Sequence, residues 1–220
     1  YTDASGQEIL CVLTIEDENG ILTEYDNKGT QIKQIMISDE EFMRSRPGSI
    51  VRCQDGSYIV YNSHEMYLLE DSGDMISQQE CPGAYFQNVL QFKDGTVYTT
   101  YLSETSTENY IAKVNMKSGE LSEKQSLPCA GDWVCEGENG QVLLMDGKAL
   151  YCYDMATQEA ETIVETTLYN IFKDRVIALN TTGDSVRILS WKDKNEALPM
   201  ELITLTQKTE EELAKEEEEA

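Results

Sequence analysis

Residues 50–80, IVRCQDGSYIVYNSHEMYLLEDSGDMISQQE, decide the fold. Four short runs rich in Val, Ile, Leu and Tyr alternate with polar segments, as expected for strands separated by turns. Asp55-Gly56 separates the first two runs, and Asp71-Ser72-Gly73 separates the last two. Asp-Gly is a strong signal for a two-residue hairpin, in which both central positions need positive φ. The stretch therefore predicts four antiparallel strands, a to d, joined by a tight turn, a loop and a second turn.

The same four-strand pattern recurs along the chain. The a–b turns step by 39 and 45 residues, at Asp55-Gly56, Asp94-Gly95 and Asn139-Gly140. The c–d turns step by 44, 46 and 39 residues, at Gly29, Gly73, Gly119 and Gln158, the last in place of glycine. Four antiparallel strands in about 40–45 residues match one blade of a β-propeller.

We therefore predict an all-β fold, a β-propeller of four-stranded antiparallel blades with about five blades in residues 1–206. The blades lie near residues 9–37, 50–80, 89–127, 134–164 and 169–206. The first shows only strands b, c and d. Either another segment supplies its missing strand and five blades close, or the chain is an arc of a larger ring. A β-sandwich is the alternative fold, but its strands would not repeat one pattern at this spacing.

Two segments depart from the strand pattern. Residues 38–45, SDEEFMRS, predict one helical turn with Ser38 as its N-cap. Residues 207–220, QKTEEELAKEEEEA, have almost no apolar surface and predict a solvated acidic linker or tail. Thr209 and Glu212 have the spacing of a capping box, so a short helix is the alternative there. A linker at this point indicates that a further domain follows in a longer protein.

Charge limits the classes of partner. The 220 residues include 41 acidic and 17 basic side chains, a formal net charge of -24. A surface this acidic repels phosphate backbones and anionic lipid, so we expect no nucleic-acid partner. No apolar run approaches the roughly 20 residues that span a bilayer, so we expect no direct membrane insertion. We expect a monomer.

The cysteines and the single histidine argue against a metal centre. None of the six cysteines forms a CxxC pair, and His64 is the only histidine. Zinc sites need clustered Cys and His, so we expect no metal and no cofactor. Cys53 and Cys152 lie in apolar strand patterns, where cysteine acts as a small hydrophobe. We favour free thiols over disulfides.

Motifs for catalysis are missing from the sequence. It contains no GxSxG, P-loop or HExxH motif, and no nucleophile motif accompanies His64. Residues 13–20 and 68–74 are rich in carboxylates but lack the EF-hand register. We therefore expect a non-enzymatic binding or interaction domain. Two alternatives stay open: a glycan lyase or hydrolase that uses channel carboxylates, and a purely structural spacer.

Ligands of propellers usually meet the face where the d–a and b–c connections converge. Two d–a connections match each other, Cys81-x-Gly83-x-Tyr85 and Cys129-x-Gly131-x-Trp133. Their aromatic residues stack on sugars or fill a partner's pocket, or else wedge between blades. In the earlier d–a connection, residues 38–49, the basic pair Arg44 and Arg46 is expected to bind an anion or to form salt bridges with the acidic surface. The candidate binding residues are Arg44, Arg46, His64, Tyr85, Phe86, Asp132 and Trp133.

The repeat resembles a known family. Residues 93–102, KDGTVYTTYL, and 109–121, NYIAKVNMKSGEL, resemble blades of bacterial secreted propellers of the WD40/YVTN-like kind, although the Trp-Asp signature of WD40 repeats is absent. Residues 202–207, LITLTQ, followed by a linker, resemble the end of the N-terminal propeller of extracellular solute-binding lipoproteins of gut Firmicutes. The resemblance implies an extracellular or cell-surface location, with a lipid anchor in a segment outside this chain.

The resemblance also implies that solute binding and partner contact belong to different domains. The domain that follows the propeller would bind the transported solute, so no residue of this chain is assigned to solute binding. The propeller itself would contact a glycan, a peptide or an adjacent protein domain.

Overall fold

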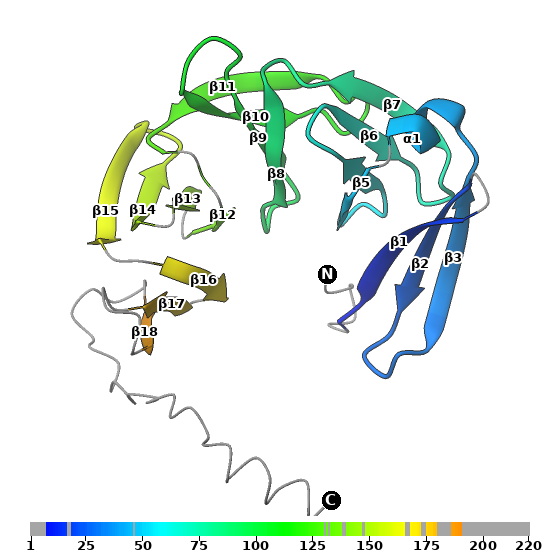
Figure 1. Ribbon diagram of the computed structural model, residues 1–220, viewed down its shortest axis with the longest axis horizontal. Helices are drawn as coiled ribbons and strands as arrows, with labels where there is room; N and C mark the ends of the chain where they lie inside the picture. The colour runs from blue at the N-terminus through cyan, green and yellow to red at the C-terminus, as the bar shows by residue number, and fades with distance from the viewer. Residues whose placement is uncertain are drawn as a thin grey trace, which may run out of the picture. The chain divides into compact units, whose positions relative to one another are not determined.

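The computed structural model describes nineteen elements of secondary structure (Figure 1). The described residues are 8–16, 19–45, 47–129, 131, 133–137, 140–146, 148–165, 168–172, 175–179 and 186–190. Side chains are described through residue 163, except those of Met43 and Trp133. The chain divides into two compact units, residues 1–145 with 152–161, and residues 146–151 with 162–220.

The strands form five sheets, each built from consecutive strands. Sheet 1 contains β1 (Leu10–Glu16), β2 (Asn19–Tyr25) and β3 (Gln31–Ile37). Sheet 2 contains β4 (Ser49–Arg52), β5 (Tyr58–Tyr61), β6 (Glu65–Leu69) and β7 (Met75–Glu80). Sheet 3 contains β8 (Tyr85–Gln91), β9 (Val97–Leu102), β10 (Asn109–Val114) and β11 (Leu121–Leu127).

Sheet 4 contains β12 (Trp133–Glu136), β13 (Gln141–Met145), β14 (Ala149–Asp154) and β15 (Glu159–Glu165). Sheet 5 contains β16 (Leu168–Phe172), β17 (Arg175–Leu179) and β18 (Val186–Ser190). Every pairing of sheets 2 and 3 is antiparallel. The predicted all-β fold of four-stranded antiparallel units is confirmed. The predicted boundary at residue 206 and the tail at 207–220 lie outside the described residues.

The turns at Gly29, Gly56, Gly73 and Gly95 share one geometry, which differs from the predicted one. In the a–b turn of sheet 2, the amide of Gly56 donates to the carbonyl of Cys53 (3.0 Å), and the amide of Cys53 donates to the carbonyl of Ser57 (2.9 Å). Only Gly56 has positive φ (93°). In each of these turns, therefore, only the glycine adopts the left-handed conformation with positive φ. The expectation of positive φ at both Asp55 and Gly56 is wrong.

Side chains bury both faces of sheet 2, which explains its unbroken apolar strands. Successive residues of a strand point to opposite faces of its sheet. Tyr58 and Val60 of β5 join a cluster with sheet 1, whereas Ile59 of β5 joins a cluster with sheet 3. The members of both clusters are at most 6% exposed. Sheets 1, 2 and 3 therefore stack face to face within the first unit.

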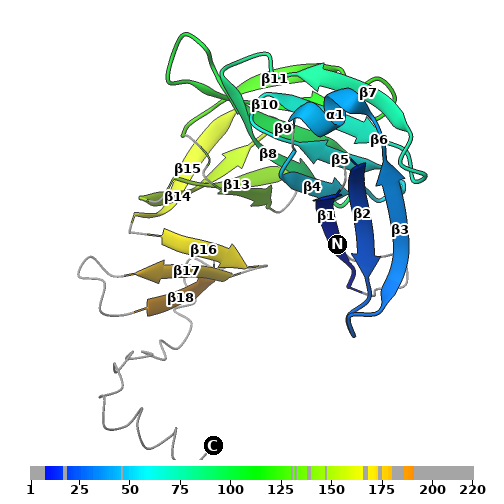
Figure 2. The same cartoon turned by 45° about the vertical axis from the view of Figure 1, so that its right-hand side comes forward.

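The segment between β3 and β4 contains α1 (Glu40–Ser45), close to β6 in two views (Figures 1 and 2). A helix was predicted here, but its N-cap is Asp39, whose Oδ1 accepts the amide hydrogen of Phe42 at 2.8 Å. Ser38 instead donates its hydroxyl to Asn19 Oδ1 at 2.8 Å. Phe42 is fully buried, and its ring meets that of Tyr67 edge-on at 5.1 Å. The helix is thereby fixed to sheet 2.

Of the six cysteines, Cys53 is buried and the other five are partly exposed. In the part of the chain that the structure describes, no three His, Cys, Asp or Glu side chains are grouped so that they could hold a metal ion. A search of the same residues finds no helix long and apolar enough to cross a membrane.

Candidate functional site

The loop between β5 and β6, residues 62–64, is the meeting point of two longer connections. Asn62 Nδ2 donates to the carbonyl of Ser45 at the end of α1 (2.9 Å). Asn62 Oδ1 accepts the amide hydrogens of His64 (2.7 Å) and Glu65 (2.8 Å). One side chain thus holds both the shape of the loop and the position of the helix.

The connection between sheets 2 and 3 lies against the other side of this loop. The amide of Cys81 donates to the carbonyl of His64, and the amide of Phe86 donates to the carbonyl of Ser63, each at 2.7 Å. Three segments therefore meet within the first unit through main-chain and amide hydrogen bonds. We call them together the connection face; it consists of residues 40–45, 62–64 and 81–86.

Known proteins with the same fold are recognisable by structure alone. No family model matches the chain, and no curated protein matches its sequence. Among solved structures, a protein of unknown function from Bacteroides caccae superimposes with a TM-score of 0.55 at 12% identity, over 90% of this chain and 71% of its own. The Neurospora crassa Pan2 WD40 domain gives 0.52 at 11% identity, over 87% and 65%. The Dos1 propeller gives 0.55 at 9% identity, over 87% and 57%.

The fold is a β-propeller. The chain spans less than two thirds of the length of the Pan2 and Dos1 structures that it matches. At these identities the likeness concerns the fold only, and sheets 1 to 5 correspond to the predicted blades. We refer to them as blades 1 to 5. The resemblance to solute-binding lipoproteins stays a prediction.

Three of the predicted binding residues are exposed on the connection face. Arg44 is exposed on α1, and His64 is exposed in the loop of residues 62–64. Tyr85 opens β8 and is 40% exposed. Segments 20 to 40 residues apart in the sequence are thus brought to one place, with a cation, an imidazole and a phenol directed to solvent.

Phe86 differs from the expectation. It is 4% exposed and meets the Tyr101 ring edge-on at 6.5 Å, inside the cluster shared by blades 2 and 3. Neighbouring strand residues point to opposite faces, so Tyr85 is exposed on one face of β8 while Phe86 packs on the other. Phe86 therefore anchors the start of β8 in the cluster shared by blades 2 and 3, and it is not accessible to a ligand.

The side chains of the other three predicted binding residues are not among those that the structure describes. Arg46 and Asp132 lie outside the described residues. Trp133 begins β12, and only its backbone is described.

The two matching motifs use glycine for different reasons. A Cβ atom on Gly83 would overlap the carbonyl oxygen of Leu102, which accepts the amide hydrogen of Ala84 at 2.8 Å. Gly131 instead has positive φ (55°), and its carbonyl accepts Nδ2 of Asn88 at 2.9 Å. The first glycine permits a close approach of two backbones, and the second permits a left-handed turn.

Sequence reasoning missed a charged network between blades 1 and 2. Arg52 Nε lies 3.1 Å from Glu24 Oε1, with side chains 12% and 5% exposed. Arg52 Nη2 and Lys33 Nζ each lie 2.5 Å from Asp71 Oδ1. The Tyr58 hydroxyl donates to Glu24 Oε1 at 2.8 Å, and the guanidinium stacks 4.1 Å from the centre of the Tyr58 ring.

The network is neutral in sum, with two cations and two carboxylates. The hydrogen bond from Lys33 is the main cause that lowers the pKa of Asp71, and Arg52 adds to it. Burial, and then the bond to Glu24, raises the pKa of Tyr58. Arg52 and Glu24 are largely buried, whereas the Asp71 side chain is 62% exposed. Paired groups of this kind favour a structural role, as a clamp between blades.

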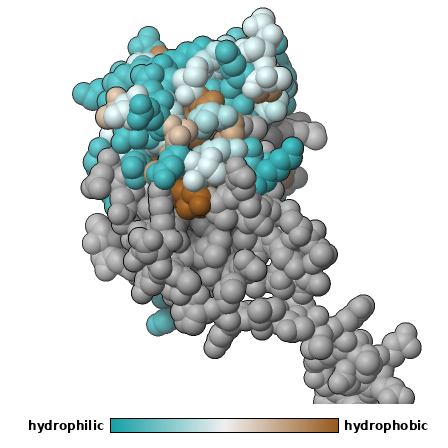
Figure 3. Space-filling model, turned by 90° about the vertical axis from the view of Figure 1, so that its left-hand side faces the viewer, coloured by the Kyte–Doolittle hydropathy of each residue, from teal (hydrophilic) through white to brown (hydrophobic). Residues whose placement is uncertain are grey.

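The exposed surface of the described residues is mostly hydrophilic in the view of Figure 3, with few hydrophobic side chains among them. This agrees with the net charge of -24. Exposed aromatic or cationic groups such as Tyr85 and Arg44 therefore stand out chemically from their surroundings.

Proposed function

We propose that this propeller is a non-enzymatic binding domain that engages a protein or peptide partner through the connection face. The observation that carries the proposal is the convergence of Arg44, His64 and Tyr85 around the loop of residues 62–64. Their backbones are held by hydrogen bonds, and Phe42 and Phe86 anchor the segments from below. Exposed side chains on a rigid support lose little entropy on binding.

The residue types favour a protein partner over a glycan. Tyr and Arg are enriched among residues that dominate protein–protein binding energy. Arg44 carries one of only 17 basic side chains in the chain, so it offers a local attraction to an acidic segment of a partner. The Tyr85 ring also offers a stacking surface for a sugar, which makes a glycan the competing ligand.

The pKa shifts of the carboxyl groups favour a binding function over glycan cleavage. Glycosidases need one carboxylic acid whose pKa is raised. Among the described residues, each carboxyl group with a shifted pKa has it lowered, namely Asp26, Asp71, Asp94, Glu108 and Asp154. Hydrogen bonds from backbone amides or neighbouring side chains lower these pKa values. Such carboxylates are poor proton donors near neutral pH.

We further propose an extracellular or cell-surface location, as the family resemblance implies. Localisation by surface protease treatment of intact cells tests this part separately.

Binding of the purified chain to arrays of synthetic peptides and glycans tests the proposal. We expect acidic, aromatic-containing peptides to bind, and the triple variant Arg44→Ala, His64→Ala, Tyr85→Ala to bind at least tenfold more weakly. The matched control replaces the exposed cations Lys28 and Lys117 by alanine and keeps full binding. Silence on both arrays, or equal binding by the triple variant, overturns the proposal. Binding to glycans alone overturns the choice of partner.

A further inference from the structure

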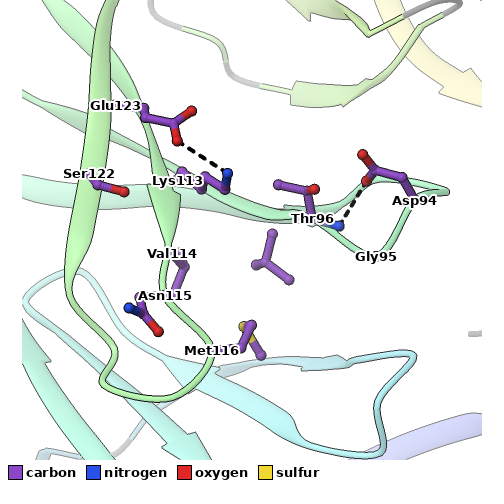
Figure 4. Close-up of a pocket in the computed structure, with 10 residues that line it drawn as sticks. Asp94, Gly95, Thr96, Lys113, Val114, Asn115, Met116, Ser122 and Glu123 are labelled. Atoms are coloured by element: carbon purple, nitrogen blue, oxygen red, sulfur yellow. Dashed lines mark hydrogen bonds and ion pairs between the residues drawn. The ribbon is translucent and has the colours of Figure 1, made fainter.

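Blade 3 contains a pocket of about 520 Å³ at the end where its two tight turns lie side by side (Figure 4). The β8–β9 turn contributes Asp94, and β10 and β11 contribute Lys113 and Glu123. Val97, Val114 and Met116 supply apolar side chains. The connection face uses the b–c and d–a connections, so this pocket lies at the opposite end of the strands of blade 3.

A strained bulge sets one wall of the pocket. Ile111 pairs with Gln125 and Lys113 pairs with Ser122, so two residues of β11 oppose one residue of β10. Glu123, in this bulge, has φ of 52°, in the left-handed region that non-glycine residues rarely adopt. Bulges re-aim side chains and are common beside binding sites. Here the bulge brings Glu123 Oε1 within 3.1 Å of Lys113 Nζ.

Two carboxylates and one ammonium give the rim of the pocket a negative charge. Asp94 Oδ1 accepts the amide hydrogen of Thr96 at 2.8 Å, and this bond holds the pKa of Asp94 below its usual range. Figure 4 shows Asp94 and the Lys113–Glu123 pair at one edge of the pocket and Met116 at the other. Val97 and Val114 are 1% and 3% exposed. An apolar floor below a carboxylate rim suits a lysine or arginine, whose stem is apolar and whose head is cationic.

A second pocket adjoins the first. Its volume is about 400 Å³, and it shares Asn115 and Ser122 with its neighbour. Glu120 and Gln79 also line it, so it too offers a carboxylate and an amide. Two adjacent pockets fit an extended chain, in which side chains on one face are about 6–7 Å apart, better than one compact ligand.

We propose that these two pockets form one groove that binds an extended basic peptide segment. A lysine or arginine side chain fills the first pocket with its head between Asp94 and Glu123, and a second basic or amide side chain enters the pocket beside Glu120. The net charge of -24 attracts such a segment from a distance. Pro82 of the connection face also lines the second pocket, but Arg44, His64 and Tyr85 line neither pocket. Variants of the groove and variants of the proposed binding residues therefore test the two proposals separately.

Fluorescence anisotropy of a labelled peptide of alternating lysine and serine, titrated with the intact chain, tests the groove. The double variant Asp94→Asn, Glu123→Gln keeps an acceptor for the amide of Thr96 and removes two charges. We expect it to weaken binding about tenfold or more. The control Glu104→Gln, Glu159→Gln removes the same charge at exposed positions outside both pockets and is expected to bind within twofold of the wild type.

The variant Lys113→Ala should change peptide affinity in the opposite direction to that expected from misfolding. It removes the internal competitor for Glu123, so we expect the basic peptide to bind more tightly. Circular dichroism verifies the fold of each variant. Absence of binding by the wild type overturns the proposal. So does an equal loss in the control double variant, which marks non-specific attraction, or equal binding of a peptide of alternating glutamate and serine.

Discussion

Arg52 Nη2 lies 2.5 Å from Asp71 Oδ1, although Arg52 ends the first strand of blade 2 and Asp71 lies in the turn between its third and fourth strands. The same guanidinium reaches Glu24 in blade 1. Arg52 therefore ties two turns of one blade to the neighbouring blade. The face of Tyr58 completes the clamp.

Removal of Arg52 should destabilise the first unit strongly. Arg52→Ala leaves the buried carboxylate of Glu24 without its cation, which typically costs about 3 kcal/mol or more. Urea denaturation followed by circular dichroism measures the change. Lys113→Ala, which breaks an exposed ion pair in blade 3, is the matched control and should cost clearly less. Equal losses in the two variants would show that burial of the Arg52 network is irrelevant.

Acid should weaken the contribution of Asp71. Its pKa is lower in the folded chain than in the unfolded chain, so its ion pairs add stability above the unfolded pKa of about 3.9 and lose it as the pH falls through the folded value. The stability difference between the wild type and Asp71→Asn should be largest at neutral pH and shrink toward pH 3. Urea melts at both pH values test this. A difference that does not depend on pH would exclude ionisation of Asp71 as its cause.

The sequence predicted the strands because each one is an apolar run between turn residues. The sequence did not predict how neighbouring blades pack against each other. Lys33 and Arg52 are 38 and 19 residues from Asp71. The fold of blade 2 brings Arg52 to Asp71, and the packing of blades 1 and 2 brings Lys33 to the same carboxylate. For the same reason the sequence assigned Asp71 only to a turn between two strands.

The sequence singled out the connections of the candidate site, but not how their side chains lie. The matching Cys-x-Gly-x-aromatic motifs singled out residues 81–86, but the exposure of Tyr85 and the burial of Phe86 depend on which face of β8 meets blade 2. Asn62 was missed altogether. Its place in the loop before His64, where asparagine favours a side-chain turn, is the signal that would have found it.

Gln158 occupies the position that glycine holds in other c–d turns, and it adopts φ of 59°. A left-handed conformation costs a non-glycine residue about 1–2 kcal/mol, part of which glycine loses again through its greater freedom in the unfolded chain. Gln158→Gly should therefore stabilise the chain by up to about 1 kcal/mol. Thermal unfolding measures the gain. Thr157→Gly, at a neighbouring turn position without positive φ, should be destabilising instead, and stabilisation by both variants would contradict this explanation.

Burial should make two thiols unreactive in the folded chain. It raises the pKa of Cys53 to about 11 and that of Cys135 to about 12. At pH 8, a pKa of about 11 leaves roughly one thiol in a thousand ionised, against roughly one in four at an unperturbed value of about 8.5. Iodoacetamide labelling with peptide mass spectrometry should modify both cysteines slowly in buffer and rapidly in urea. Rapid labelling of Cys53 in buffer would show that the cluster between blades 2 and 3 opens readily in solution.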